Sequence, residues 1–179
     1  MPNYPTSKWA DERFVCLSLV TVLKAMRIRI LWEGKTKDSH MRAIQEDLAG
    51  RIEHFIPLSL EEFPVLRGVQ QFSQSALTSP ESKLLEKLRG ATKILLDERG
   101  RERTSQEFAD WLGQEALHGS KDVAFLIGGP DGFSAAFRAK ADVLLALSRM
   151  TLTRDWARTL LLEQIYRAFT ILRGFPYSR

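Results

Sequence analysis

Cysteine is nearly absent from the chain, since Cys16 is the only one among 179 residues. A lone thiol excludes an intramolecular disulfide framework and a cysteine-based zinc site, and it is typical of proteins in a reducing compartment. Histidine is also scarce: His40, His54 and His118 are widely separated and show no metal-ligand spacing. We therefore predict a cytoplasmic protein without a metal ion.

Long hydrophobic runs are missing as well. No stretch approaches the about 18 apolar residues that a membrane-spanning helix needs, so no membrane partner is predicted. The run "FVCLSLVTVLKA" (14–25) has the length of a secretory core, but acids precede it and no small-residue cleavage site follows. With 44% hydrophobic and 27% charged residues, the composition is typical of one soluble globular domain.

Nucleotide-binding signatures are absent from the glycine-rich stretch "FLIGGPDGFS" (125–134). It matches neither G-x-G-x-x-G nor G-x-x-x-x-G-K-S/T. Pro130 also removes a backbone donor that a phosphate cradle would use. Two interpretations stay open: a plain tight turn, or a loop where a ligand approaches bare backbone because glycine has no β-carbon.

Acidic residues are few in the last segment, 148–179, which carries six arginines and two acids. The whole net charge of +4 therefore lies there. The planar guanidinium suits phosphate recognition, so this excess favours RNA or DNA as a partner. Within the segment, Glu163 and Arg167 are spaced as a structural i,i+4 ion pair.

Strand-like and helix-like patterns alternate from Met26 onward, which predicts an α/β fold with a mainly parallel sheet flanked by helices. Ile28, Ile30 and Trp32 should face one side of the first strand. Thr104 and Glu107 form a predicted capping box. The predicted strands are 26–32, 54–61, 92–97, 122–129 and 141–148; the predicted helices are about 37–52, one ending at Gly90, 104–118, one starting near Ser134, and about 155–173.

The first 25 residues differ in composition from the rest. They are predicted to be an N-terminal extension or the product of a mis-assigned start codon, with Met26 as the true start. The alternative is an additional helix that packs on the domain.

Three strand ends are expected to meet, because ligands bind beyond the carboxyl ends of parallel strands. They are residues 95–97, 128–130 and 148–152. For Asp97 and Asp131, which follow two of these strands, capping of neighbouring loops is the favoured role.

Taken together, these endings have a specific pattern: "LLDERG", "DVAFLIGGPDG", "LALSRMTL" and "RTLLLEQIYRAFTILRGFPYSR". The chain from Met26 to Arg179 resembles the RlmH family of small SPOUT-class methyltransferases, most strongly from Val123 onward. These enzymes methylate N3 of pseudouridine 1915 in 23S ribosomal RNA.

The resemblance implies a SPOUT methyltransferase domain over 26–179, with a deep C-terminal trefoil knot over about 120–179. It also implies a homodimer, S-adenosylmethionine as methyl donor, and 23S rRNA within the ribosome as partner. Arg154, Tyr177 and Arg179 become the candidate catalytic residues; Arg154, Arg158 and Arg179 are expected to contact RNA. The implied cofactor-binding residues are Leu96, Gly129, Ser148, Arg149, Met150, Thr151, Leu152 and Thr153.

The sequence departs from the family pattern at two places. Thr153-Arg154 stands where the family has Pro-His, and Ser178 stands where it has histidine before the final basic residue. Arginine cannot replace histidine as a base, because it stays protonated. Three hypotheses therefore stay open: the family reaction, a non-catalytic RNA- or ribosome-binding relative, and a SPOUT methyltransferase with another RNA target.

Overall fold

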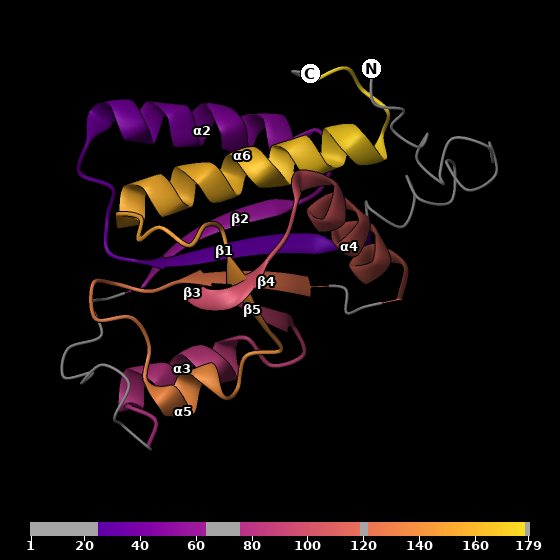
Figure 1. Ribbon diagram of the computed structural model, residues 1–179. Coiled ribbons are helices and arrows are strands. Elements are labelled where there is room, and N and C mark those ends of the chain that lie inside the picture. Colours follow the sequence, from indigo (N-terminus) through magenta and orange to yellow (C-terminus); the bar gives the residue numbers. More distant parts are fainter. Residues whose placement is uncertain (1–24, 64–75, 119–121, 178–179) are drawn as a thin grey trace.

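A computed structural model describes residues 25–63, 76–118 and 122–177 (Figure 1). These residues form a five-stranded sheet in the order β2-β1-β4-β3-β5, in which all neighbouring strands are parallel. This arrangement confirms the predicted α/β fold. The strands are β1 (Arg27–Glu33), β2 (Leu58–Phe63), β3 (Thr92–Glu102), β4 (Asp122–Ile127) and β5 (Val143–Ala146); the helices are α2 (Ser39–Glu53), α3 (Ser79–Lys87), α4 (Ser105–His118), α5 (Ala135–Arg138) and α6 (Arg154–Leu172).

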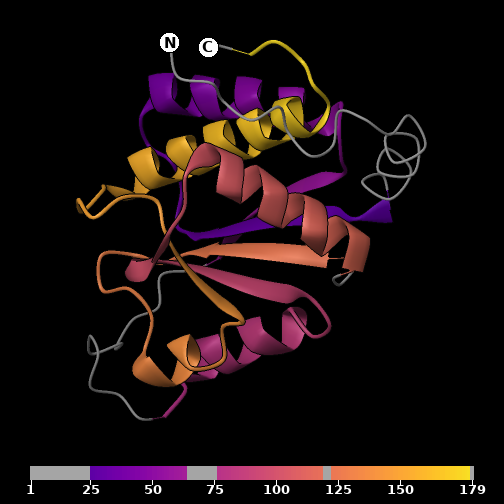
Figure 2. The same ribbon diagram turned by 45° about the vertical axis from the view of Figure 1, so that its right-hand side comes forward.

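Helices cover both faces of the sheet (Figures 1 and 2): α2, α4 and α6 lie on one side, and α3 and α5 on the other. The core is divided accordingly. Phe125 of β4 belongs to the cluster under α2, α4 and α6, whereas its neighbour Leu126 belongs to the cluster under α3. The near-continuous apolar run of β4 is therefore buried on both faces.

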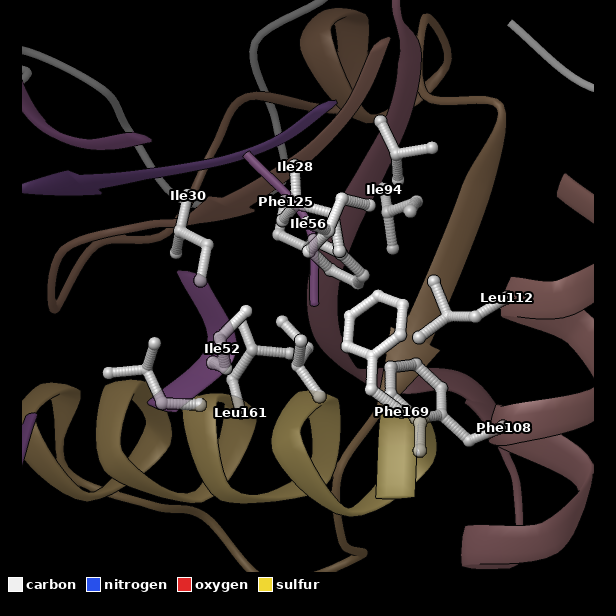
Figure 3. Packing of buried hydrophobic residues seen from close by; sticks show 14 of the residues in the cluster. Ile28, Ile30, Ile52, Ile56, Ile94, Phe108, Leu112, Phe125, Leu161 and Phe169 are labelled. Atoms are coloured by element: carbon white, nitrogen blue, oxygen red, sulfur yellow. The ribbon is translucent and has the colours of Figure 1, made fainter. Parts of the chain in front are cut away.

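The larger cluster confirms the predicted alternation of the first strand. Ile28, Ile30 and Trp32 all point into it. Figure 3 shows Ile28 and Ile30 on the same side as Phe125, with α6 residues such as Phe169 across from them.

Strand boundaries differ from the expectation by one to five residues, and two of the differences are larger than the rest. The predicted strand 54–61 begins only at Leu58, because α2 continues to Glu53 and residues 54–57 form the turn that ends in Pro57. The predicted strand 92–97 continues to Glu102 although its apolar run has ended. Hydrogen bonding to the neighbouring strand, and not side-chain burial, extends it.

The extension of β3 wraps closely around β5. Leu145 pairs with both Leu96 and Arg101, so the intervening residues arch over β5. A β-carbon at Gly100 would lie 2.6 Å from the backbone carbon of Leu144, which only glycine avoids. The trefoil knot itself stays a prediction.

Helix caps fix the loops at the ends of the sheet. The predicted capping box is confirmed: Glu107 accepts the N–H of Thr104 at 2.7 Å, and Thr104 accepts the N–H of Glu107 at 3.2 Å. A second capping box, Thr78 with Glu81, opens α3; it has the same T-x-x-E spacing but was not predicted. The Glu163–Arg167 ion pair is also present, with Nε and Oε1 3.0 Å apart.

Candidate functional site

The three predicted strand ends meet around one cavity of about 690 Å³. Parallel strands place their carboxyl ends on one edge, so the loops that follow β3, β4 and β5 converge there. Residues from all three loops line the cavity, together with the start of α6. They are Leu96, Asp97, Glu98, Ile127, Gly128, Gly129, Pro130, Gly132, Phe133, Leu145, Leu147, Ser148, Met150, Thr151, Leu152, Thr153, Arg154 and Ala157.

The loop after β4 is a closed turn. The N–H of Gly132 donates to the carbonyl of Gly129 at 3.0 Å, and Pro130 occupies the second position, where its fixed φ fits. Gly132 has φ +65°, a conformation that glycine adopts without strain. Residues 129–132 therefore form a tight turn that is also one wall of the cavity, and the approach of a ligand to its backbone stays a prediction.

The loop after β5 is held by the extension of β3. Glu98 accepts a hydrogen bond from the Thr151 hydroxyl at 3.0 Å, and Glu102 pairs with Arg149 at 2.8 Å. Arg149 therefore points to Glu102 and is not among the lining residues. Glu98 is a site residue that the sequence did not reveal, because its position in the wall depends on the bend of β3 around β5.

Asp97 caps its own loop, as predicted. One carboxylate oxygen accepts the N–H of Arg99 at 2.9 Å, and the other pairs with Arg138 of α5 at 3.0 Å. With both oxygens engaged, Asp97 anchors the wall of the cavity. Asp131 is exposed in the turn, and its capping role stays a prediction.

Arg158 corrects the expectation that it contacts RNA. It is 1% exposed and lies over the ring of Trp32, 5.0 Å from the ring centroid. Its guanidinium donates to the Thr36 hydroxyl at 2.8 Å and to the Glu33 carbonyl at 2.6 Å. Burial lowers the pKa of Arg158, an effect that Arg154 reinforces. Arg158 is a structural residue that secures the end of β1.

Arg154 and Tyr177 lie at opposite ends of α6. Arg154 is the first helical residue and lines the cavity. The helix has 19 residues, or roughly 28 Å at 1.5 Å per residue. Tyr177 lies beyond its far end, where it contacts the Tyr166 ring at 4.7 Å and the Arg167 guanidinium at 4.9 Å. One chain therefore does not bring Tyr177 to the cavity, and Arg179 lies outside the described residues.

The C-terminal arginines do not gather in one patch. Arg149 pairs with Glu102 and Arg167 with Glu163, while Arg173 lies over Phe55 at 6.0 Å. Among the described residues, no group of three or more potential metal ligands occurs. Within the same residues, no helix has the length and hydropathy to cross a membrane.

A family model described as "Predicted SPOUT methyltransferase" matches residues 26–178. The chain belongs to the SPOUT methyltransferase family. Its relatives include the "Ribosomal RNA large subunit methyltransferase H" of Geobacter sp. (strain M21), which is 45% identical over 154 residues, 85% of this chain and 98% of the relative. The protein of that name from Geobacter sulfurreducens is 42% identical, over 85% of this chain and 99% of the relative.

Solved structures give a more distant likeness to this SPOUT chain. The TrmH/SpoU tRNA-modifying enzyme of A. aeolicus is 13% identical with a TM-score of 0.45, and the match covers 90% of this chain and 87% of that one.

Proposed function

We propose that the protein transfers the methyl group of S-adenosylmethionine to N3 of a pseudouridine, position 1915, in 23S rRNA. It would act in the cytoplasm on the large subunit of the assembled ribosome. The observation that carries this proposal is the cavity at the three strand ends, in a chain 45% identical to a named rRNA large subunit methyltransferase along 98% of its length.

The cavity suits S-adenosylmethionine in size and chemistry. About 690 Å³ lies within the range of ligand pockets. Apolar side chains such as Leu96 and Leu147 suit an adenine ring, and the turn at Gly129 and residues 148–153 offer backbone groups to its edges. When bound, the cofactor supplies a methyl group on a sulfonium, which is already a good leaving group.

The protein must then position the RNA base and assist loss of the N3 proton. Arg154, at the cavity wall, can donate to a carbonyl oxygen beside N3 and stabilise the charge that develops there. It cannot take the proton, because a guanidinium stays protonated. Among the lining residues, Glu98 is the carboxylate suited to accept it: Thr151 donates to one oxygen of Glu98, whereas Arg99 and Arg138 engage both oxygens of Asp97.

A homodimer is part of the proposal. Exposed hydrophobic side chains border the cavity: Met150 is 76% exposed, Leu152 36%, and Trp156 of α6 59%. Such a group is typical of a protein–protein interface. Arg154 and Tyr177 lie at opposite ends of α6 in one chain. In a homodimer, Tyr177 of one copy can approach Arg154 of the other.

The proposed methyltransferase domain comprises residues 26–179, with the knot over about 120–179, and residues 1–25 form an extension to it. The family match that begins at residue 26 supports this division. So does Met26, which is 2% exposed and packs in the main hydrophobic cluster.

Methyl transfer to ribosomes tests the function directly. Purified protein and radiolabelled S-adenosylmethionine are incubated with ribosomes from cells that lack this gene, and the labelled nucleotide is mapped by mass spectrometry. We expect label on N3 of the pseudouridine. Label on another nucleotide would assign a different RNA target, and cofactor binding without any transfer would assign a non-catalytic relative.

A further inference from the structure

The extension of β3 carries acidic and basic residues that meet different neighbours. Glu98 and Glu102 face the loop after β5: Glu98 accepts a hydrogen bond from Thr151, and Glu102 pairs with Arg149. The strand shifts register between Leu96 and Arg101, so side chains alternate regularly only from Arg101 onward, and Arg101 lies on the side opposite Glu102. Arg99 in the irregular stretch, Arg101 in the strand and Arg103 just after it make up what we call the arginine ridge.

The arginine ridge is open to solvent at one end and partly desolvated at the other. Arg99 and Arg101 are exposed, and Arg103 is half-buried. The Arg103 guanidinium lies over the Trp111 ring at 5.1 Å, and its buried Nε has no hydrogen-bond acceptor among the described residues. Stacking on an indole fixes the plane of a guanidinium without using its terminal N–H donors.

Like charges lie close together on this ridge. Burial lowers the pKa of Arg103, and repulsion from the charge of Arg101 lowers it further, while the charges of Glu107 and Glu115 act in the opposite direction. The nearby carboxylate of Glu107 is already engaged by Thr104 in the capping box. A bound anion would relieve this repulsion.

We propose that the arginine ridge binds the phosphate backbone of the RNA that enters the cavity. Arg101 and Arg103 are alternate residues, which in extended backbone lie about 6.6 Å apart, close to the spacing of successive phosphates along a nucleic-acid strand. The ridge also continues directly from Leu96, Asp97 and Glu98, which line the cavity. RNA held along the ridge is thereby led to the site of reaction.

RNA is favoured over other anionic partners by this geometry. Three arginines within five residues, beside the cavity, match a polymer of phosphates, and arginine binds phosphate through paired donors. The inference rests on the proposed function only for the identity of the RNA as rRNA.

Binding of ribosomes tests the ridge separately from the chemistry. The variants are Arg101→Ala, Arg103→Gln and their combination, with Arg103→Lys as a charge-conserving variant. Arg27→Ala is the matched control: Arg27 is exposed and ion-paired with Asp122, but it lies at the amino-terminal ends of β1 and β4, away from the cavity. Affinity for unmodified large ribosomal subunits is measured against salt concentration, and affinity for S-adenosylmethionine by calorimetry.

We expect the double variant to bind the subunits roughly tenfold more weakly, with the salt slope reduced by about 1 for each arginine removed. Arg103→Lys should retain most of the slope. Affinity for S-adenosylmethionine and the thermal midpoint of Arg101→Ala should match those of the Arg27→Ala control. If affinity for the subunits and the salt slope are unchanged, or fall only as much as in Arg27→Ala, the proposal that the ridge binds RNA is wrong.

The two proposals fail in different ways. If the protein methylates ribosomes but the ridge variants bind them as tightly as wild type, the ridge does not bind RNA and the proposed function is unaffected. If the ridge variants lose RNA affinity and salt slope but no methyl group is ever transferred, the ridge binds RNA and the proposed reaction is wrong. A wild-type protein that binds no RNA would overturn both.

Discussion

Gly129 lies directly against the carboxyl group of Glu33: an ideal β-carbon added at Gly129 would fall 2.5 Å from Cδ of that side chain. Glu33 ends β1 and is 3% exposed, so its carboxyl group has no free route into solvent. The contact joins the end of β1 to the turn after β4, its neighbour in the sheet. A β-carbon at this position therefore displaces the buried Glu33 carboxyl group, independently of any ligand.

Gly129→Ala is expected to lower the free energy of unfolding by about 1–3 kcal/mol, because the added methyl group overpacks the contact. Adding Glu33→Ala should recover part of that loss, which urea unfolding of the two single variants and the double variant would show. Gly132→Ala is the control: its cost arises from φ +65° alone and nothing lies within 4 Å, so Glu33→Ala should not rescue it. Additive effects at Gly129 and Glu33 would contradict the contact as the cause.

Arg158 and Arg149 should differ sharply in their effect on stability. Arg158→Ala leaves the Thr36 hydroxyl and the Glu33 carbonyl without their buried donor, and we expect a loss of about 2–4 kcal/mol. Arg149 forms an ion pair with its side chain 87% exposed, so Arg149→Ala should cost less than about 1 kcal/mol. Urea unfolding measures both, and equal losses would refute the structural role of Arg158.

Local patterns predicted much of this fold. The alternation of Ile28, Ile30 and Trp32, the capping box of Thr104 and the meeting of three strand ends each depend on residues close in sequence or on general rules for parallel sheets. These features can therefore be predicted from the amino-acid sequence alone.

Contacts between distant segments could not be predicted in this way. Glu81 is fully buried and accepts hydrogen bonds from Thr78 in its own cap and from the N–H of Ser134, 53 residues away. No local pattern reports such a link. Similarly, counting charge by segment placed the whole excess at the C-terminus, because Glu98 and Glu102 offset the charges of the neighbouring arginines in the count, although both glutamates are engaged by the loop after β5.

The contribution of Glu61 to the stability of the fold should depend on pH. It pairs with Arg29 at 2.9 Å and Lys87 at 2.6 Å. Burial alone would raise the pKa of Glu61, but the hydrogen bonds and charges of Arg29 and Lys87 outweigh it and lower the pKa from 4.5 to about 2. A folded pKa below the unfolded one stabilises the fold above about pH 4.5, and this contribution is lost as the pH falls towards 2.

Glu61→Gln should therefore lower the free energy of unfolding by up to about 3 kcal/mol at pH 7, and by less than about half of that at pH 3. Urea titrations at the two pH values measure the difference. The exposed Glu53 provides the control, and Glu53→Gln should have little effect at either pH. An effect of Glu61→Gln that does not shrink at low pH would exclude the ion pairs as its origin.

Arg154 provides the sharpest test of the proposed chemistry, because it is the cation among the residues that line the cavity. Loss of the N3 proton leaves negative charge that is shared with the flanking carbonyl oxygens, and a positioned guanidinium stabilises that charge. Arg154→Ala should lower the single-turnover rate at saturating S-adenosylmethionine by about 10²–10³. Calorimetry should show cofactor affinity nearly unchanged.

Arg154→Lys keeps the charge but loses the planar pair of donors, so its rate should lie between those of wild type and Arg154→Ala. Arg27→Ala, which removes an exposed ion pair with Asp122 at the amino-terminal ends of β1 and β4, serves as the matched control. A normal rate with weakened cofactor binding would instead assign Arg154 to the cofactor.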